Sequence, residues 1–368
     1  MWNPRGVFRF VLKTCFVVAL FSISELYSKP SILLSFVPDV LESKHIEKKE
    51  GPQTWEYSIF SSNLQFDGAM AVALSGEHSQ TNGVLDQRGT LYPEKYKLTQ
   101  AMQKAGYECV LFSGSSIFAQ AQLLERNLKI INPASEDYEI AEKPVFYFYD
   151  VRGERAWENW NVMHQRLADQ KDDVILITVF APSKPQFSWK CRVEGPGDLT
   201  PFVSHAELAV IDLVNTILAY ADLPLLDLKN SSNFLANEGS TAKARTVFYF
   251  RYWSHLADGE TPAHFGVRLG KTSLTFFYGV DYQEPVGPAE DDEEFLKAVS
   301  VNRTEPYWSY QNESIPLKSD FQRNLLVDGL KEQLRRIRLN LGEEERNYPH
   351  IAEILEKHWD DAVDYSRE

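Results

Sequence analysis

Four short apolar runs alternate with helical patterns in the first half of the chain, and this alternation constrains the fold more than any other feature. The runs are SILLSF (31–36), YECVLFSG (107–114), PVFYFYDV (144–151) and DDVILITVF (172–180). Short runs that are apolar at nearly every position are typical of strands with both faces buried between two layers. With helices between them, they predict an α/β fold: a mainly parallel sheet flanked by helices.

The segments between these runs carry helix signals. Pro93 opens a helix that places Leu98, Met102 and Ala105 on one face, and Gly106 ends it. Three further segments are predicted to be helical, the last as one long helix: DGAMAVALSG (67–76), RAWENWNVMHQRLADQ (155–170) and VSHAELAVIDLVNTILAYADLP (203–224). The polar stretch 42–58 is predicted as a loop and a surface helix.

The composition changes after residue 228. Residues 229–244 (KNSSNFLANEGSTAKA) are polar and small, which is typical of a linker. RTVFYFRYW (245–253), HFGVRLG (264–270) and SLTFFYGVD (273–281) then predict a small antiparallel sheet. A last amphipathic helix aligns four apolar side chains on one face, namely Leu326, Leu330, Leu334 and Ile337.

Charge and the first residues restrict partners and location. The net charge of −14 argues against binding to nucleic acid or to an anionic membrane surface. Residues 1–28 combine Arg5, Arg9 and Lys13 with the apolar run CFVVALFSI, which is the layout of a signal peptide. The chain is therefore expected to be secreted, periplasmic or otherwise extracytoplasmic, with an uncleaved signal anchor as the alternative. No other segment is predicted to span a membrane, and the oligomeric state is left open.

Two cysteines remain after the signal. Cys109 and Cys191 could pair in an oxidising compartment, although two separate buried thiols are the preferred interpretation. The sequence contains no G-x-S-x-G elbow, P-loop, HExxH or paired-cysteine zinc motif.

Two long stretches together resemble the sulfatase family. LSGEHSQTNGVLDQRGTLYPEKYKLTQAMQKAGYECVLFSG (74–114) is similar to the family stretch LTGxYxHxNGV…TLxxxLxxAGYxTxxxGKWH, and residues 247–279 are similar to YYRYWxH…PxHYGVRTxRYKLIYFYG. The resemblance implies an alkaline-phosphatase/sulfatase-like fold. It assigns residues 29–228 to an N-terminal α/β domain, 229–244 to a linker and 245–368 to a C-terminal domain.

The residues that the family uses for sulfate-ester hydrolysis are replaced in this chain. The resemblance places Phe66 at the nucleophilic cysteine and Met70 at the motif arginine. Gly114 and Ser116 stand where the family has lysine and histidine, and Phe180-Ala181 stands where it has a metal-binding pair. Asp39 is the only remaining candidate ligand for the family's calcium ion, so no cofactor and no catalytic residue are expected. Phe66 and Phe180 are expected to pack against each other, with Met70 nearby, in place of a polar site.

The C-terminal stretch offers the candidate substrate-binding residues, which are Arg251, His255, His264 and Arg268. Arginine and histidine donors suit a sulfated or carboxylated sugar, although Arg268 could equally bridge the two domains. The resulting hypothesis is a secreted, catalytically inactive pseudo-sulfatase that binds a sulfated or acidic glycan. The alternatives are an active sulfuric ester hydrolase or related hydrolase with a rearranged site, and a pure protein-interaction module.

Overall fold

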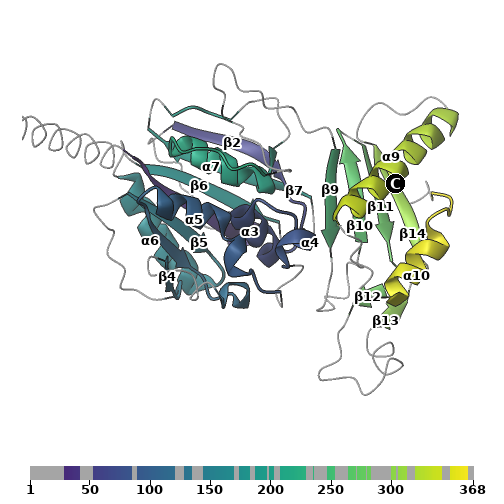
Figure 1. Cartoon of the computed structure of the whole chain (residues 1–368), viewed down its shortest axis with the longest axis horizontal. Helices are drawn as coiled ribbons and strands as arrows, with labels where there is room; N and C mark the ends of the chain where they lie inside the picture. Colours follow the sequence, from purple (N-terminus) through teal and green to yellow (C-terminus); the bar gives the residue numbers. More distant parts are fainter. Residues whose placement is uncertain are drawn as a thin grey trace, which may run out of the picture.

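A computed structural model gives the fold of the chain (Figure 1). It describes residues 29–41, 53–84, 89–120, 128–134, 144–169, 174–182, 187–196, 199–202, 208–228, 235, 247–252, 264–270, 272–278, 280–282, 300–303, 306–312, 320–341 and 349–363. The predicted signal peptide and most of the predicted linker lie outside these residues. Every helix in the described part is too short or too polar to cross a lipid bilayer.

The described N-terminal part is built on one large sheet. Its strands are β1 (Ser31–Pro38), β2 (Gln53–Phe60), β3 (Glu108–Phe112), β4 (Leu128–Ile131), β5 (Val145–Asp150), β6 (Val174–Ala181), β7 (Ser188–Gly195) and β8 (Leu208–Ala209). They lie in the order β4-β3-β5-β1-β6-β7-β2-β8. The five strands from β4 to β6 are mutually parallel, while β7 is antiparallel to both β6 and β2. The predicted mainly parallel sheet is confirmed.

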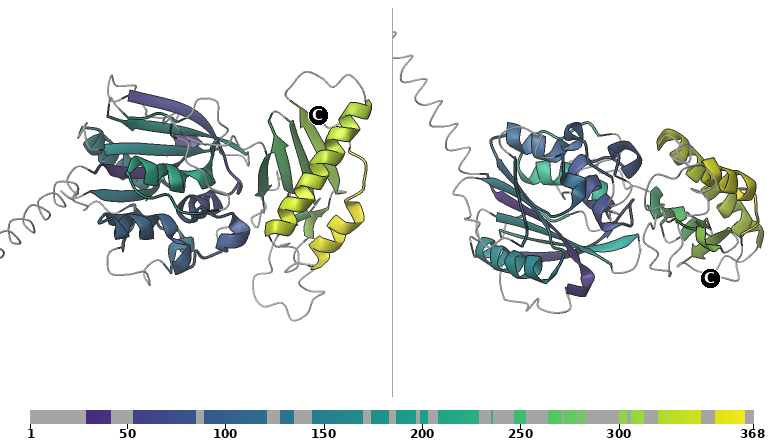
Figure 2. Two further views of the ribbon diagram at one scale, coloured as in Figure 1. Left: turned by 45° about the horizontal axis from the view of Figure 1, so that its top comes forward. Right: turned by 90° about the horizontal axis from the view of Figure 1, so that it is seen from below.

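Helices cover both faces of this sheet (Figure 2). They are α3 (Phe66–Ser75), α4 (Ser79–Asn82), α5 (Lys97–Lys104), α6 (Glu154–Ala168) and α7 (Leu213–Tyr220). Side chains alternate along each strand, so Phe36 belongs to the core under α3, α5 and α7, while Val37 belongs to the core under α6. Short 3-10 turns occupy Pro93–Lys95, Ser116–Phe118 and Val210–Asp212.

Two of the predicted elements are wrong. Residues 53–58, expected within a loop and a surface helix, belong to β2, where half-buried Trp55 and Tyr57 alternate with exposed Thr54, Glu56 and Ser58. Within the predicted helix 203–224, the described residues 208–224 form β8, a 3-10 turn and α7 in place of one continuous helix. Leu208 and Ala209 pair with β2 as a strand, and Asp212 Oδ2 accepts a hydrogen bond from the Ala209 N–H at 3.0 Å, which turns the chain into the helix.

The C-terminal part contains the predicted antiparallel sheet, in the order β14-β11-β10-β9. Its elements are β9 (Val247–Tyr252), β10 (His264–Leu269), β11 (Thr272–Phe277), β14 (Tyr307–Asn312), the small pair β12 (Val280–Tyr282) and β13 (Ser300–Arg303), and the helices α9 (Asp320–Leu341) and α10 (Pro349–His358). The predicted apolar face of α9 is confirmed, because Leu330 and Leu334 are buried against the sheet and Leu326 and Ile337 pack beside them. Helix α10 follows it, so α9 is not the final helix as expected.

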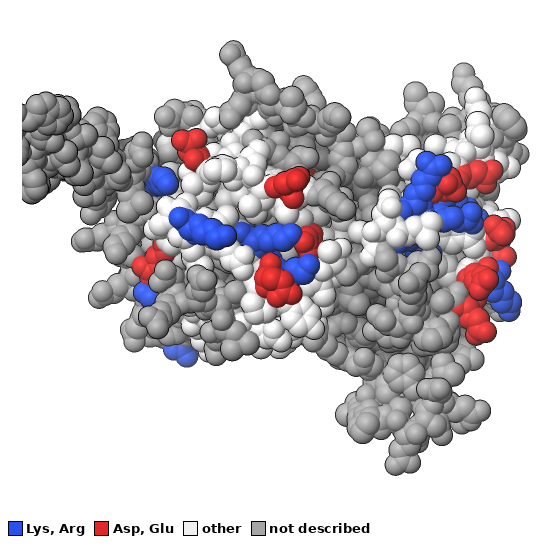
Figure 3. All heavy atoms as spheres, viewed as in Figure 1, with Lys and Arg blue, Asp and Glu red and all other residues white. Residues whose placement is uncertain are grey.

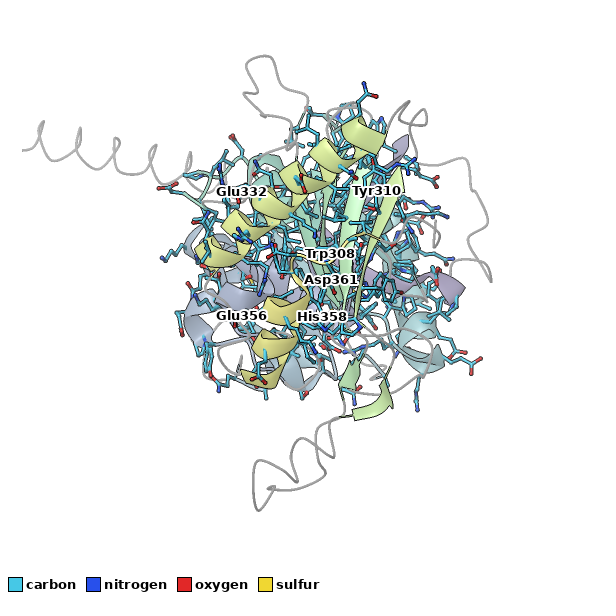
Figure 4. All side chains as sticks on the ribbon, turned by 90° about the vertical axis from the view of Figure 1, so that its right-hand side faces the viewer. Trp308, Tyr310, Glu332, Glu356, His358 and Asp361 are labelled. Atoms are coloured by element: carbon cyan, nitrogen blue, oxygen red, sulfur yellow. The ribbon has the colours of Figure 1, made fainter. Side chains whose placement is uncertain are left out.

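The end of α10 is bound to this sheet and to α9 (Figure 4). Trp308 Nε1 of β14 donates to the His358 carbonyl at 3.1 Å, and Lys331 Nζ of α9 donates to the Trp359 carbonyl at 2.8 Å. Carbonyls in the last turn of a helix receive no hydrogen bond from an N–H group of the same helix. The Trp308 and Lys331 side chains donate to the carbonyls at this end in place of water. The two helices and the sheet therefore form one connected unit.

Aromatic contacts join the two sheets. Phe187, just before β7, packs on Phe250 of β9 with ring centroids 5.2 Å apart. The Arg268 guanidinium of β10 lies over Phe187 and Phe60, with its Cζ 4.7 and 5.1 Å from their centroids. On the face drawn in Figure 3, the described Lys and Arg side chains lie among Asp and Glu side chains.

Candidate functional site

A pocket of about 810 Å³ lies where β3, β4 and β5 reach their carboxyl ends. Such edges of parallel sheets are the usual place for ligands in α/β proteins. The pocket walls are the start of α3, the loops that follow the three strands, and the first turn of α6, and its lining includes Asp67, Ser115, Asn132, Asp150 and Arg152.

The start of α3 fixes Asp67. Gln65 is extended, and its N–H donates to Asn63 Oδ1 at 2.9 Å, which turns the chain just before the helix begins at Phe66. Asp67 is thereby placed in the first helical turn, where the unpaired N–H groups and the helix dipole favour a negative charge. Only 7% of its side chain is exposed.

The end of β5 fixes Asp150 and Arg152. The Val151 N–H donates to the Phe36 carbonyl of β1 at 2.9 Å, so the strand pairing continues one residue past Asp150. Gly153 follows with φ of 93°, a left-handed conformation that suits glycine, and α6 begins at Glu154. Arg152 is thus held between the last strand residue and the first helical turn.

One guanidinium binds both carboxylates. Arg152 Nε donates to Asp150 Oδ1 at 2.8 Å and Nη2 donates to Asp150 Oδ2 at 2.6 Å, which is a two-pronged ion pair. Arg152 Nη1 donates to Asp67 Oδ2 at 2.9 Å. The guanidinium also lies over the Phe66 ring, with Cζ 5.2 Å from its centroid.

Two serines complete the network from the loop after β3. Ser113 Oγ donates to Asp150 Oδ2 at 2.7 Å, and Ser115 Oγ donates to Asp67 Oδ1 at 2.5 Å. All four carboxylate oxygens therefore accept at least one hydrogen bond. Three chain segments that are far apart in sequence meet at this point.

Charge and donor positions determine what the network offers to a ligand. Burial alone would lower the pKa of Arg152, but the hydrogen bonds and charges of Asp150 and Asp67 outweigh it and raise the pKa above its ordinary value. Arg152 is therefore cationic at every pH at which a protein folds. Its bonds to the two aspartates use three of its five N–H groups. The other two have no acceptor in the described part of the chain, and 37% of the side chain is exposed at the pocket.

The calcium ion that the sulfatase resemblance implies does not fit these residues. Asp67 and Asp150 are both bound to a guanidinium, and the described residues contain no group of three His, Cys, Asp or Glu that could hold a metal. Asp39, the predicted remaining ligand, follows the end of β1. Its Oδ1 is buried without a hydrogen bond, but a single carboxylate is too few ligands for calcium.

The residues expected to fill the lost active site lie in two different cores. Met70 is fully buried and Phe66 is partly buried in the core under α3, whereas Phe180 is buried in the core under α6. The expectation that Phe66 and Phe180 pack together is therefore wrong. Adjacent residues of a strand point to opposite faces, and it is Ala181 that faces the side of Phe66. Phe66 packs instead on Phe36, with centroids 6.1 Å apart.

Three of the predicted substrate-binding residues belong to strands that do not line this pocket: Arg251 to β9, and His264 and Arg268 to β10. His264 is 6% exposed and packs on Phe277 with ring centroids 4.9 Å apart. Arg268 packs on Phe60 and Phe187 of the N-terminal part, which agrees with the alternative that Arg268 bridges the two parts of the chain. Only the backbone of Arg251 is described and His255 lies outside the described residues, so their roles stay predictions.

Sequence reasoning missed Asp67, Asp150 and Arg152, although one signal was present. Strand β5 is buried at all six positions and ends in Asp150, followed by Arg152 and Gly153. A buried charge at a strand end requires a partner. Gly114 and Ser116, which replace the family's lysine and histidine, do line the pocket.

The sequence matches no known protein-family profile and no curated protein, but solved structures match its fold. BT1596, a 2-O GAG sulfatase, is 11% identical and has a TM-score of 0.55, with 87% of this chain and 94% of that one covered. BT4656, solved in complex with its substrate D-glucosamine-2-N,6-O-disulfate, is 10% identical with a TM-score of 0.52, covering 86% and 99%. The phosphonate monoester hydrolase SpPMH from Silicibacter pomeroyi is 10% identical with a TM-score of 0.52, covering 86% and 96%.

At this level of identity the matches establish the fold. The chain has a sulfatase-like α/β domain and, after it, a small antiparallel sheet with packed helices.

Proposed function

We propose that this protein is a secreted, catalytically inactive sulfatase-like protein that binds a sulfated or acidic sugar in the Arg152 pocket. The observation that carries the proposal is that Arg152 is a fixed, charged side chain with N–H groups still unused. Two carboxylates fix its position and keep it charged, while its two remaining N–H groups are available to the pocket.

The first residue of α3 supports the proposal that the protein is inactive. A helix N-terminus at the carboxyl edge of the sheet is a suitable place for a nucleophile, but Phe66 occupies it. A phenyl ring has no lone pair to attack sulfur, and this ring is covered by the Arg152 guanidinium. Hydrolysis at this position would need a different nucleophile.

The pocket favours a ligand that accepts hydrogen bonds. The oxygens of Asp67 and Asp150 are already engaged, so the donors that the pocket lining offers are the remaining Arg152 N–H groups and the backbone at the start of α6. Sulfate and carboxylate oxygens match a planar guanidinium. Of two proteins with a similar fold, one is a 2-O GAG sulfatase and the other was solved in complex with a disulfated glucosamine. This likeness supports a sulfated sugar as the ligand. The N-terminal signal-like segment supports an extracytoplasmic site of action.

Titration calorimetry of the purified chain with D-glucosamine-2-N,6-O-disulfate and with unsulfated glucosamine tests this function. We expect the disulfated sugar to bind and the unsulfated one to bind at least tenfold more weakly. Arg152→Lys, which keeps the charge but loses the planar guanidinium with its paired N–H donors, should weaken binding roughly tenfold. Arg166→Ala, an exposed arginine further along α6, is the control and should bind as the wild type does. Equal binding by the Arg152→Lys variant would place the ligand elsewhere.

A second candidate function is a hydrolase with a rearranged site. Ser115 Oγ donates to Asp67 Oδ1 at 2.5 Å beside Arg152, so a serine, a carboxylate and a cation are adjacent. In this mechanism Ser115 Oγ attacks sulfur as Asp67 takes its proton, and Asp67 returns that proton to the ester oxygen as the alcohol leaves. Water then attacks sulfur, which releases sulfate and restores the serine hydroxyl. Turnover of an aryl sulfate that Ser115→Ala abolishes would establish this function and refute the inactive one. Absence of turnover in the wild type would support the proposed function.

A further inference from the structure

We propose that the Arg152 guanidinium is the resident cation of this site, taking the place of a divalent metal ion, so that the pocket assembles without metal. The proposal concerns how the site is held together, and it stands whether or not the pocket binds a sugar.

Two nearly buried carboxylates at one point need a cation. Asp67 and Asp150 are 5% and 1% exposed, and both contact the same guanidinium. Two carboxylates that share a poorly solvated site repel each other, and both stay ionised only if a positive charge lies between them. A divalent ion with carboxylate ligands can fill this role. Here the Arg152 guanidinium provides the positive charge, and, unlike a bound metal ion, it cannot dissociate from the protein.

The connections of Arg152 are those of a bridging ion. Through Asp67 it holds the start of α3, through Asp150 it holds the end of β5, and each aspartate is bound in turn by a serine of the loop after β3. A metal ion joins its ligands in the same way, by drawing separate segments onto one centre. The guanidinium does so with directional N–H groups, and it is less strongly hydrated than a small metal ion or an ammonium group.

This role predicts opposite responses to ions in two proteins. The wild type already has its cation, so calcium, magnesium, manganese or a chelator should leave its thermal unfolding unchanged. Arg152→Ala removes the cation and leaves the oxygens of Asp67, Asp150, Ser113 and Ser115 around the vacated space. That variant should unfold at a lower temperature and should regain stability when a small cation is supplied.

Differential scanning fluorimetry of the full chain tests the proposal with each divalent chloride at millimolar concentration and with dilute guanidinium chloride. We expect the melting temperature of Arg152→Ala to rise by about 2 °C or more with at least one of these cations, and that of the wild type to stay constant. Choline chloride at equal ionic strength is the salt control. Asp67→Asn combined with Arg152→Ala removes one carboxylate and should lose the rescue.

Three outcomes would overturn the proposal: stabilisation of the wild type by a divalent cation, a melting temperature of Arg152→Ala equal to that of the wild type, or a folded Arg152→Ala that no cation stabilises. If Arg152→Ala fails to fold, Arg152→Gln replaces it, because the shorter amide side chain fills part of the space and retains hydrogen-bond donors without the charge. Failure of sugar binding would refute the proposed function and leave this inference intact, since unfolding is measured without sugar.

Discussion

Gly68 of α3 and Asn63 are packed so closely that a Cβ atom on Gly68 would lie 1.9 Å from Asn63 Nδ2. Asn63 is 1% exposed, donates to Ser79 Oγ at 2.7 Å, and accepts from the Gln65 N–H at the turn into α3. Asn63 therefore positions the start of α3 and, with it, Asp67. The Asn63 side chain leaves room only for glycine at position 68.

Gly68→Ala should lower the free energy of unfolding by about 2–4 kcal/mol, because the methyl group displaces Asn63 and leaves buried polar groups without partners. Urea unfolding measures the loss. Gly329→Ala in α9 is the matched control: a Cβ there meets nothing within 4 Å, so alanine should be neutral or stabilising by about 0.5–1 kcal/mol. A Gly68→Ala protein as stable as the control would show that Asn63 moves freely.

Arg268→Ala should weaken the contact between the two sheets. Its guanidinium lies over two rings, and loss of this stacking should lower the free energy of unfolding by about 1–2 kcal/mol. Affinity for a sulfated sugar should stay unchanged, because Arg268 packs against Phe60 and Phe187, which do not line the pocket. Thermal unfolding and calorimetry measure the two effects. Reduced sugar affinity at unchanged stability would instead restore Arg268 as a ligand-binding residue.

The elements that the sequence predicted well are those with a strong local signal. Strands β5 and β6 are apolar at nearly every position because both sides are covered, and α9 carries a clear 3.6-residue pattern. Strand β2 was missed because it lies toward the edge of the sheet, where half-buried Trp55 and Tyr57 alternate with exposed polar residues that resemble a loop. The segment 203–224 was assigned a single helix because a buried strand and a buried helix are equally apolar.

The candidate site could not be predicted in the same way. Asp67, Ser115 and Asp150 come from three segments, and only the sheet order places the ends of β3 and β5 beside the start of α3. The resemblance that places Phe180 at the family's metal-binding pair carries no information on which face of the strand each residue occupies. A shift of one residue reverses the face, and so Phe180 and Phe66 were wrongly placed together.

The two cysteines should be chemically inert in the folded protein. Burial raises the pKa of Cys191 to about 12, and burial together with the charge of Glu108 also raises the pKa of Cys109. The thiolate is the reactive form. With Cys15 replaced by Ser, we expect iodoacetamide at neutral pH to modify neither thiol in the native protein and both in urea. Mass spectrometry counts the adducts, and rapid labelling without urea would contradict the buried positions.

Glu77 follows the C-terminal end of α3 and connects this helix to the segment that leads into α5. It forms ion pairs with Lys95, at 2.8 Å, and with Lys97. Burial by itself would raise the pKa of Glu77, but the hydrogen bonds and charges of the two lysines outweigh it, so its pKa lies below the ordinary value of 4.5. A carboxyl whose pKa is lower in the folded state stabilises the fold above its unfolded pKa, and this stabilisation is lost as the pH falls through the folded pKa.

Glu77→Gln should therefore lower the free energy of unfolding by about 1 kcal/mol at neutral pH, where the ionised carboxylate pairs with both lysines. The difference from the wild type should shrink as the pH falls below about 4.5, because protonated Glu77 then resembles the amide. Urea unfolding across a series of pH values measures this difference. Glu94→Gln, an exposed neighbour of Lys95, is the control and should show neither effect. A Glu77→Gln deficit that persists unchanged at acidic pH would mean that the side chain contributes packing alone, without its charge.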